Sequence, residues 1–236
     1  MVAESAALIR LGGSRGTTKT DWLHSRHSFS FGEYHDASWL GFRSLRVIND
    51  DIVAPGAGFG MHGHRDMEIV TVVLSGQLEH RDSLGNGAVL GPGEVQAMSA
   101  GTGVRHSEFN PSKDQPAHFL QIWIQPRSAG LAPSYAQRRF DEPDRRNCWC
   151  RIAGPPGPDG ALQIAQDADV FRAAIPAGAV LSKALGAGRG AWLHVIEGEV
   201  SLSGRRHLSG DAVGLVGVSE LHIAASQPSE LLLFEV

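Results

Sequence analysis

The sequence is short of cysteine, of long apolar runs and of positive charge, and each shortage excludes a class of protein. Its 236 residues contain two cysteines, Cys148 and Cys150, which are too few and too close together for a disulfide framework. No stretch approaches the roughly 18 apolar residues that a membrane-spanning helix needs. The 21 basic and 25 acidic residues give a formal net charge of −4, so the chain has no general basic field for nucleic acid.

The N-terminal segment differs from a secretory signal peptide, because Glu4 stands where such a peptide carries positive charge. We therefore expect a soluble, cytoplasmic protein that has no membrane partner and makes no direct contact with nucleic acid. The chain has no heptad repeat and no long exposed apolar segment, so we expect a monomer.

Glycine and proline, by contrast, are plentiful and indicate an all-β fold. The 29 glycines and 12 prolines separate short apolar and β-branched runs along the chain, which is typical of strands joined by tight turns. The composition, 42% hydrophobic and 19% charged, is sufficient for a sizeable buried core. The best candidate for a helix is a short one at residues 134–139, where Pro133 and Ser134 can start a turn.

A weak internal repeat predicts two similar halves. Residues 69–76 resemble residues 192–198, and each segment leads into a second glycine that an acidic residue follows, at Gly93 and at Gly210. Both halves read as strand, turn, strand, turn and strand. We therefore expect two β-barrels or sandwiches in one chain.

Four polar residues in two separated glycine-rich segments indicate a metal site. His62 and His64 are two residues apart, as are His106 and Glu108, so on extended strands each pair would point to one face. Two such pairs on neighbouring strands can enclose one ion. Imidazole with a single carboxylate suits a borderline divalent metal and leaves a coordination position open for water or substrate.

A simpler interpretation exists, because a single histidine is usually a surface or hydrogen-bonded residue and the chain contains 11 of them. The spacing favours the metal site. The chain resembles the two-part signature of the cupin barrel. Five residues separate a glycine from His-x-His, and Glu68, Gly76 and a second histidine beyond Gly93 follow. The spacing differs from the signature by one residue before Gly76. In that general pattern Glu68 would be the acidic ligand, whereas Glu108 shares the face of His106.

A longer set of motifs resembles the pirin family. These motifs occupy residues 22–36, 45–51, 62–71, 79–86 and 96–110. They follow the family in register over roughly residues 8–140. The resemblance implies a bicupin, an all-β protein with two tandem cupin-type β-barrels and few short helices. Residues 1–140 would form a metal-binding N-terminal cupin barrel, and residues 141–236 a degenerate C-terminal cupin barrel without metal.

The resemblance also implies the metal ligands, which are His62, His64, His106 and Glu108. Glu68 would then orient a ligand imidazole or Arg65. The second half has only His194 before Gly198, and the segment around His222 lacks an acid two residues further on. We therefore expect no metal in the C-terminal barrel.

Two other groups of residues have both structural and functional interpretations. His80 and Asp82 share one face of a strand and can line the pocket or lie on an exposed hairpin. The second group is aromatic and consists of Phe29, Phe31, Tyr34 and Trp39. We expect it to pack the N-terminal segment over the barrel, and the alternative is one wall of an aromatic-binding cavity.

Members of the pirin family show quercetin 2,3-dioxygenase activity. The resemblance thus implies a metal-dependent dioxygenase that opens the central ring of flavonols such as quercetin, using O2 and releasing carbon monoxide. The substrate would chelate the metal through its 3-hydroxyl anion, and Glu108 or a hydroxide ion would take the hydroxyl proton. Family likeness favours Fe(II), and Ni, Cu, Zn, Mn or Co also suit the ligands.

An open metal site also permits other functions. Pirins include regulators that act through protein partners, in which the metal serves as a redox sensor in place of a catalyst. The acidic charge balance argues against DNA as a partner but not against another protein. A metal-dependent isomerase or hydrolase is a third alternative.

Overall fold

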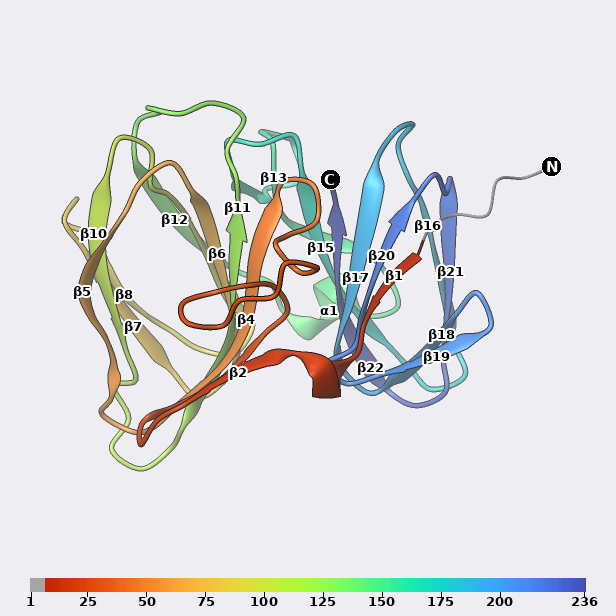
Figure 1. Ribbon diagram of the computed structural model, residues 1–236, viewed down its shortest axis with the longest axis horizontal. Coiled ribbons are helices and arrows are strands. Elements are labelled where there is room, and N and C mark those ends of the chain that lie inside the picture. The colour runs from red at the N-terminus through yellow and green to blue at the C-terminus, as the bar shows by residue number, and fades with distance from the viewer. Residues whose placement is uncertain (1–6) are drawn as a thin grey trace. The chain divides into compact units, whose positions relative to one another are not determined.

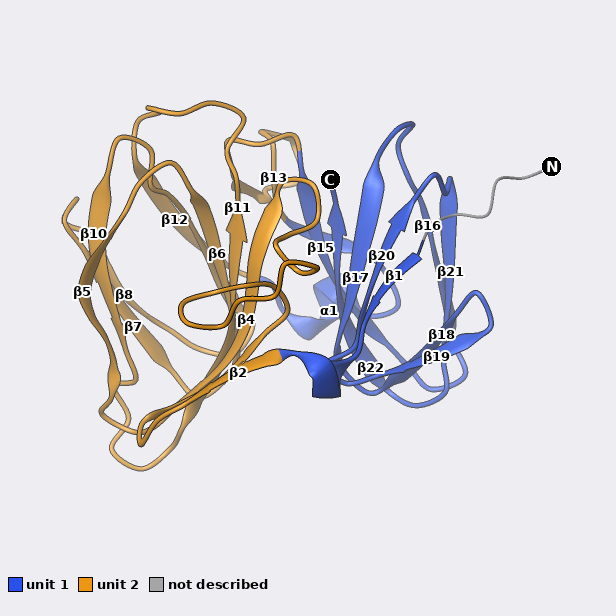
Figure 2. Ribbon diagram, in the orientation of Figure 1, with its two compact units in different colours: residues 1–15, 140–152, 168–236 blue, residues 16–139, 153–167 orange. Residues whose placement is uncertain are grey.

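The computed structural model describes residues 7–236, and nearly all of its regular structure is β-strand, which confirms the predicted fold class (Figure 1). The chain forms two compact units (Figure 2). Unit 1 comprises Met1–Arg15, Phe140–Ile152 and Ala168–Val236, and unit 2 comprises Gly16–Arg139 and Ala153–Asp167. The division that we expect between residues 140 and 141 stays a prediction, since each unit takes up more than one stretch of chain. None of the helices formed by residues 7–236 has the length and apolar character that a membrane-spanning helix needs.

Unit 2 consists of two sheets. The larger sheet has the spatial order β12 (Ser134–Arg139), β9 (Glu94–Ser99), β6 (Glu68–Ser75), β11 (Ala117–Ile124), β4 (Leu45–Val53), β3 (Leu23–His27) and β2 (Gly16–Lys19). The smaller sheet has the order β5 (Gly58–His64), β10 (Val104–Phe109), β7 (Leu78–Asp82) and β8 (Gly87–Leu90). The predicted barrel is therefore built as a cupin-like sandwich of two sheets.

The inner face of the larger sheet changes from apolar to polar along its strands. Side chains alternate between the two faces, so Val73 and Thr71 of β6 share the inner face. One end of the interior is an apolar cluster of buried residues: Leu23, Val53, Val73, Leu78, Leu90, Ala117 and Phe119. This cluster closes one end of the unit, and the polar positions begin next to it.

Unit 1 also consists of two sheets. Its larger sheet has the order β1 (Ala7–Arg10), β20 (Ala212–Val216), β17 (Gly190–Glu197), β22 (Ser229–Glu235), β15 (Asp169–Ile175) and β13 (Cys150–Gly154), of which the first three residues belong to unit 1. Its smaller sheet has the order β16 (Val180–Ala184), β21 (Glu220–Ala225), β18 (Glu199–Leu202) and β19 (Arg205–Leu208). Three short elements complete the chain: the 3-10 helix η1 (Gly12–Ser14), α1 (Glu142–Arg145) and β14 (Leu162–Gln163), which pairs with the last two residues of β13.

The two units repeat one plan, as the internal repeat predicts. The order β9, β6, β11, β4 in unit 2 matches β20, β17, β22, β15 in unit 1, and the smaller sheets match strand for strand. Gly76 and Gly198 end the equivalent strands β6 and β17 with φ of 72° and 94°. A Cβ atom at Gly76 would lie 2.3 Å from the carbonyl oxygen of Pro116, and one at Gly198 would lie 2.4 Å from that of Pro228. The repeated glycines thus mark the same close approach of backbone in both units.

The helix expected at residues 134–139 is wrong. These residues form β12, which pairs along its whole length with β9 at the edge of the larger sheet. The backbone hydrogen bonds that β9 offers outweigh the weak helical start at Pro133. A short helix, α1, lies a few residues later, where the backbone N–H of Asp141 donates to the side chain of Asp144 (3.0 Å).

The close approach at Gly198 can be tested against a glycine that also has a positive φ but has free space around it. Gly204 has φ of 74° and nothing within 4 Å of a Cβ atom. We expect Gly204→Ala to lower the free energy of unfolding by about 1 kcal/mol through backbone strain alone, and Gly198→Ala by about 3 kcal/mol because of the added clash. Urea denaturation of both variants would measure the difference, and equal losses would contradict the argument.

Candidate metal centre

Pairing of β5 with β10 brings three histidines together in unit 2. In the antiparallel register His62 lies opposite His106, and His64 lies opposite Val104. The Nε2 atom of His106 is 2.9 Å from Nε2 of His64 and 3.1 Å from Nε2 of His62. Three imidazole nitrogens from two segments about forty residues apart in the sequence therefore lie side by side.

The geometry of this histidine trio and the charge state of two of its members suit a divalent metal. Two nitrogens about 2.1 Å from a metal and at right angles would be about 3.0 Å apart, close to the distances that separate His106 from its two neighbours. Burial, together with the smaller effect of neighbouring histidines, lowers the pKa of His64 to about 4 and that of His106 to about 3. These two imidazoles are therefore neutral at pH 7 and keep a lone pair for a metal.

Glu108 lies in a second cluster beside the trio. A bulge interrupts the pairing of β10 with β5 between His106 and Glu108, and Glu108 lies opposite His80 of β7. One ligand atom from each of His80, His106 and Glu108 lies within 4.8 Å of the others, and the same holds for the trio. The two clusters share His106. That Glu108 is the fourth ligand stays a prediction.

A row of polar side chains crosses the larger sheet of unit 2, each member opposite the next on the neighbouring strand. This polar row consists of His27, Asn49, Gln121, Thr71 and Gln96, all of them buried. Thr71 Oγ1 donates to Gln121 Oε1 (3.1 Å), and Gln96 Nε2 donates to Thr71 Oγ1 (3.1 Å). These bonds orient both glutamine amides.

Both glutamine amides point their N–H groups at Glu108. Gln96 Nε2 donates to Oε1 of the carboxylate (2.7 Å), and Gln121 Nε2 donates to Oε2 (2.6 Å). Burial, which opposes the charged form, outweighs these two bonds and raises the pKa of Glu108 to about 7. The carboxyl group can therefore take up or release a proton near neutral pH.

A buried pair of residues contacts His106 on its other ring nitrogen. Nδ1 of His106 is 3.4 Å from Nδ1 of His80, and Nε2 of His80 is 3.3 Å from Oδ2 of Asp82. When His106 keeps Nε2 for a metal, its Nδ1–H donates to His80, whose Nε2–H then donates to Asp82. Both side chains are fully buried, so the interpretation of His80 and Asp82 as exposed hairpin residues is wrong.

A cavity of about 280 Å³ lies beside the trio, near the lower end of the range for small-molecule pockets. His62, His64 and Glu108 line one part of it. Its apolar lining consists of Leu23, Phe31, Phe59 and Trp123. The trio therefore faces a space that suits a small molecule with apolar faces.

The aromatic cluster near the N-terminus divides between the two expected roles. Phe31 lines the cavity and packs edge-on against Trp123, with ring centroids 5.3 Å apart. Tyr34 stacks on His27 (6.2 Å), and Phe29 is buried. One member of the cluster thus contributes to the cavity, while the others named here pack the segment.

Glu68 does not have the role that we expected. Its Oε2 accepts hydrogen bonds from the hydroxyl of Ser99 (2.5 Å) and from the backbone N–H of Ala165 (3.1 Å), and Arg65 donates to a backbone carbonyl instead. The reason is strand alternation: Thr71 faces the interior, where it bonds Gln121 and Gln96, and Glu68, three residues before it on β6, faces the other side of the sheet. Glu68 therefore orients neither a ligand imidazole nor Arg65.

Unit 1 has apolar residues where unit 2 has the histidines. On the smaller sheet of unit 1, Ile223 of β21 lies opposite Leu181 of β16 and Leu202 of β18. These residues belong to one buried apolar cluster that fills the unit. His222 lies on the opposite face of β21 with 65% of its side chain exposed. The absence of a metal from this half stays a prediction.

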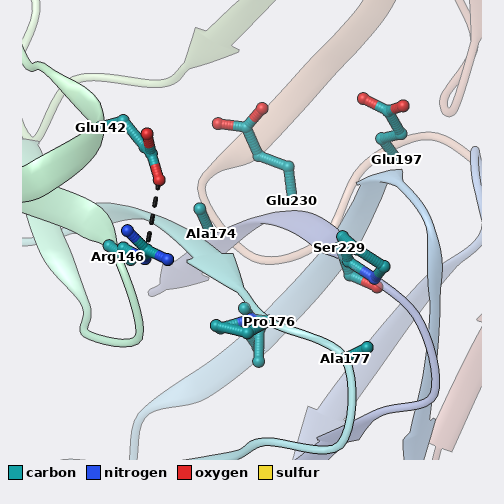
Figure 3. A pocket seen from close by; sticks show the side chains of 10 residues that line it. Glu142, Arg146, Ala174, Pro176, Ala177, Glu197, Ser229 and Glu230 are labelled. Atoms are coloured by element: carbon teal, nitrogen blue, oxygen red, sulfur yellow. Dashed lines mark ion pairs between the residues drawn. The ribbon is translucent and has the colours of Figure 1, made fainter.

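Unit 1 has a surface cavity of its own, of about 360 Å³ (Figure 3). Its charged lining residues are Glu142, Arg146, Glu197 and Glu230. Arg145 and Arg172 donate to Glu230 (2.8 and 2.7 Å), and Glu142 lies 3.8 Å from Arg146. Arginines therefore pair with two of its three carboxylates, and the described residues that line this cavity include no histidine.

Sequence reasoning did not single out Thr71, Gln96 and Gln121, which hold Glu108 in place. Each is a polar residue at a position where its strand is otherwise buried and largely apolar. Because an isolated polar residue is costly to bury without a partner, this pattern was the signal that could have indicated them.

The contact between His80 and His106 predicts an effect on metal binding. We expect His80→Leu to weaken binding of Ni²⁺ to metal-free protein by about tenfold or more, because the Nδ1–H of His106 loses its acceptor. Titration calorimetry would measure the dissociation constant. His118→Leu is the matched control, since His118 pairs with Asp50 (2.6 Å) away from the trio, and it should leave the constant unchanged.

An unchanged constant in folded His80→Leu protein would contradict this expectation. The same titration distinguishes the two clusters that share His106. If His80→Leu abolished binding while His62→Leu had little effect, the ion would be held by His80, His106 and Glu108 instead of the trio.

Comparison with known proteins agrees with this geometry. The family model described as Pirin matches residues 10–124, and the model described as Quercetinase C-terminal cupin domain matches residues 151–236. Quercetin 2,3-dioxygenase of Escherichia coli (strain K12) is 41% identical over 228 residues, which is 97% of each chain. A pirin-like protein of Caulobacter vibrioides is 39% identical over 215 residues, 91% of this chain and 92% of that protein.

Solved structures give the same result. The crystal structure of YhhW from Escherichia coli matches with a TM-score of 0.94 and 41% identity, and covers 98% of this chain and 97% of that one. The crystal structure of the bacterial pirin YhhW from Escherichia coli in complex with nickel(II) matches with a TM-score of 0.93 and 40% identity, over 98% and 99% of the two chains. With two cupin domains and this identity over nearly its full length, the chain belongs to the pirin family.

Proposed function

We propose that this protein is a metal-dependent dioxygenase that opens the central ring of flavonols such as quercetin, with the metal held by His62, His64, His106 and Glu108. The observation that carries the proposal is the convergence of three imidazole nitrogens beside a cavity with aromatic walls. The relative from Escherichia coli that bears the name quercetin 2,3-dioxygenase supports the choice of reaction.

Iron(II) is the metal that we propose, and nickel(II), which a related pirin binds, is the main alternative. Imidazole donors with one carboxylate suit either ion. The chemistry that such an ion supplies is Lewis-acid polarisation of the flavonol oxygens and electron transfer with O2. The neutral state of His64 and His106 at pH 7 supports metal binding without competition from protons.

The protein's own residues would bind the substrate and move one proton. Phe31 and Trp123 offer apolar surface to the flavonol rings, while the 3-hydroxyl lies toward the trio. Glu108 would take the proton of this hydroxyl on its carboxylate, which Gln96 and Gln121 hold in place. A carboxylate bound to a cation normally has a lowered pKa, so Glu108 would serve as the base on leaving the metal when the substrate enters.

The test of the proposed function combines elemental analysis with an activity assay. Protein purified without an affinity tag is analysed for bound metal and incubated with quercetin under air, while flavonol absorbance and released carbon monoxide are followed. Loss of flavonol with release of carbon monoxide supports the proposal. A metal-dependent change in conformation or partner binding without turnover would instead support a sensor that acts through protein partners.

Replacement of the proposed base should separate metal binding from turnover. We expect Glu108→Gln to retain metal through the three histidines and to lower kcat by about 10²-fold or more, because the variant cannot accept the proton. Glu68→Gln is the matched control, a buried glutamate on the outer face of β6, and should keep turnover close to wild type. Unchanged turnover in metal-loaded Glu108→Gln would remove Glu108 as the base.

A further inference from the structure

Asp51 is a buried acid in the same cavity that the proposed proton transfer does not use. It lies on the inner face of β4, two residues from Asn49, opposite Ser25 of β3 and Phe119 of β11. Only 3% of the residue is exposed, and it lines the 280 Å³ cavity together with His62 and Glu108. Its place is between the polar row and the apolar cluster that closes the interior.

The carboxyl group of Asp51 has an unused hydrogen-bonding position. Ser25 makes a side-chain hydrogen bond with the group, but Oδ1 is buried and has no partner. Burial raises the pKa of Asp51 to about 7. A buried carboxyl oxygen is normally satisfied, so a vacant one that borders a cavity points to a ligand.

The rest of the lining limits the chemistry of that ligand. Acidic lining residues are Glu33, Asp51 and Glu108, and the described residues that line the cavity include no lysine or arginine. A phosphate or carboxylate group would therefore find no cationic partner there apart from histidine. A hydrogen-bond donor, such as a phenolic hydroxyl, suits Asp51 in either protonation state. The apolar surfaces of Leu23 and Phe59 suit the ring that carries it.

We propose that Asp51 is a specificity-determining residue, which binds a hydroxyl group of an aromatic substrate on a ring away from the metal-chelating oxygens. This inference rests on the proposed function and extends it from flavonols in general to those that carry hydroxyl groups on their outer rings. Asp51 contributes to substrate binding and takes no part in the proton transfer of Glu108.

The test compares two flavonols that share the chelating oxygens. Quercetin carries hydroxyl groups on both outer rings, and 3-hydroxyflavone carries none. Their dissociation constants are measured by flavonol absorbance or fluorescence under anaerobic conditions with metal-loaded wild type and with Asp51→Leu. We expect Asp51→Leu to weaken quercetin binding about tenfold or more and to leave 3-hydroxyflavone binding nearly unchanged.

Two controls keep the result interpretable. Asp50→Asn changes the neighbouring carboxylate, which faces the other side of β4 and pairs with His118, and it should preserve the wild-type ratio of the two constants. Asp51→Asn retains an oxygen acceptor and should recover part of the quercetin affinity. Metal content and circular dichroism verify that each variant is folded and loaded.

The outcomes separate this inference from the proposed function. If Asp51→Leu loses the preference for quercetin over 3-hydroxyflavone, the role of Asp51 is supported whether or not the aerobic assay shows turnover. A failure of dioxygenase activity therefore bears on the proposed function and not on this inference. If Asp51→Leu keeps the wild-type preference for quercetin over 3-hydroxyflavone, the inference is overturned even when carbon monoxide is released. If neither flavonol binds to metal-loaded wild type, both the substrate class and the role of Asp51 are wrong.

Discussion

The register between β5 and β10 is the constraint on which the rest of the site depends. Side chains alternate along a strand, so a slip of one residue would turn the histidines of one strand away from those of the other. The pairing of β10 with β7, which places Glu108 opposite His80, holds β10 from its other edge, while the pairing with β5 places His62 opposite His106. Backbone hydrogen bonds thus place side chains that are forty residues apart in the chain.

The polar row is what makes a buried acid tolerable in this interior. A carboxylate removed from water loses several kcal/mol of solvation, whereas each hydrogen bond to a charged group returns about 1.5–3 kcal/mol. Two amide bonds to Glu108 therefore offset the loss only in part, in agreement with its raised pKa. The balance leaves the group able to change its protonation state near pH 7, which a surface glutamate would not do.

The two units show how one scaffold supports different interiors. Their sheets have the same strand orders and their equivalent strands end at equivalent glycines. The difference lies in a few inward positions: the smaller sheet of unit 2 contributes His62, His64 and His106, whereas that of unit 1 contributes Leu181, Leu202 and Ile223 to a buried hydrophobic cluster. The apolar cluster of unit 1 needs no hydrogen-bond partners, whereas the histidines of unit 2 border a cavity.

Local reasoning from the sequence succeeded where local properties decide structure. The all-β fold and its two similar halves were predicted, because short apolar runs between glycines and prolines describe the strands. It failed at residues 134–139, which are exposed and have no strong preference, so pairing with β9 decided their conformation. It also failed at Glu68, whose spacing matches the general cupin pattern but whose position on β6 turns it away from the cavity.

The sequence by itself determined the β-rich duplicated fold, the family and the residues able to bind a metal, because composition, turn signals and motif spacing are local properties of the chain. The tertiary structure alone decided which of these residues meet: that His80 and Asp82 lie behind His106, that two glutamines hold Glu108, and that Asp51 borders the cavity with an unpaired oxygen. The physical reason is that such contacts depend on strand register and sheet packing, which join distant segments and leave little trace in either segment alone.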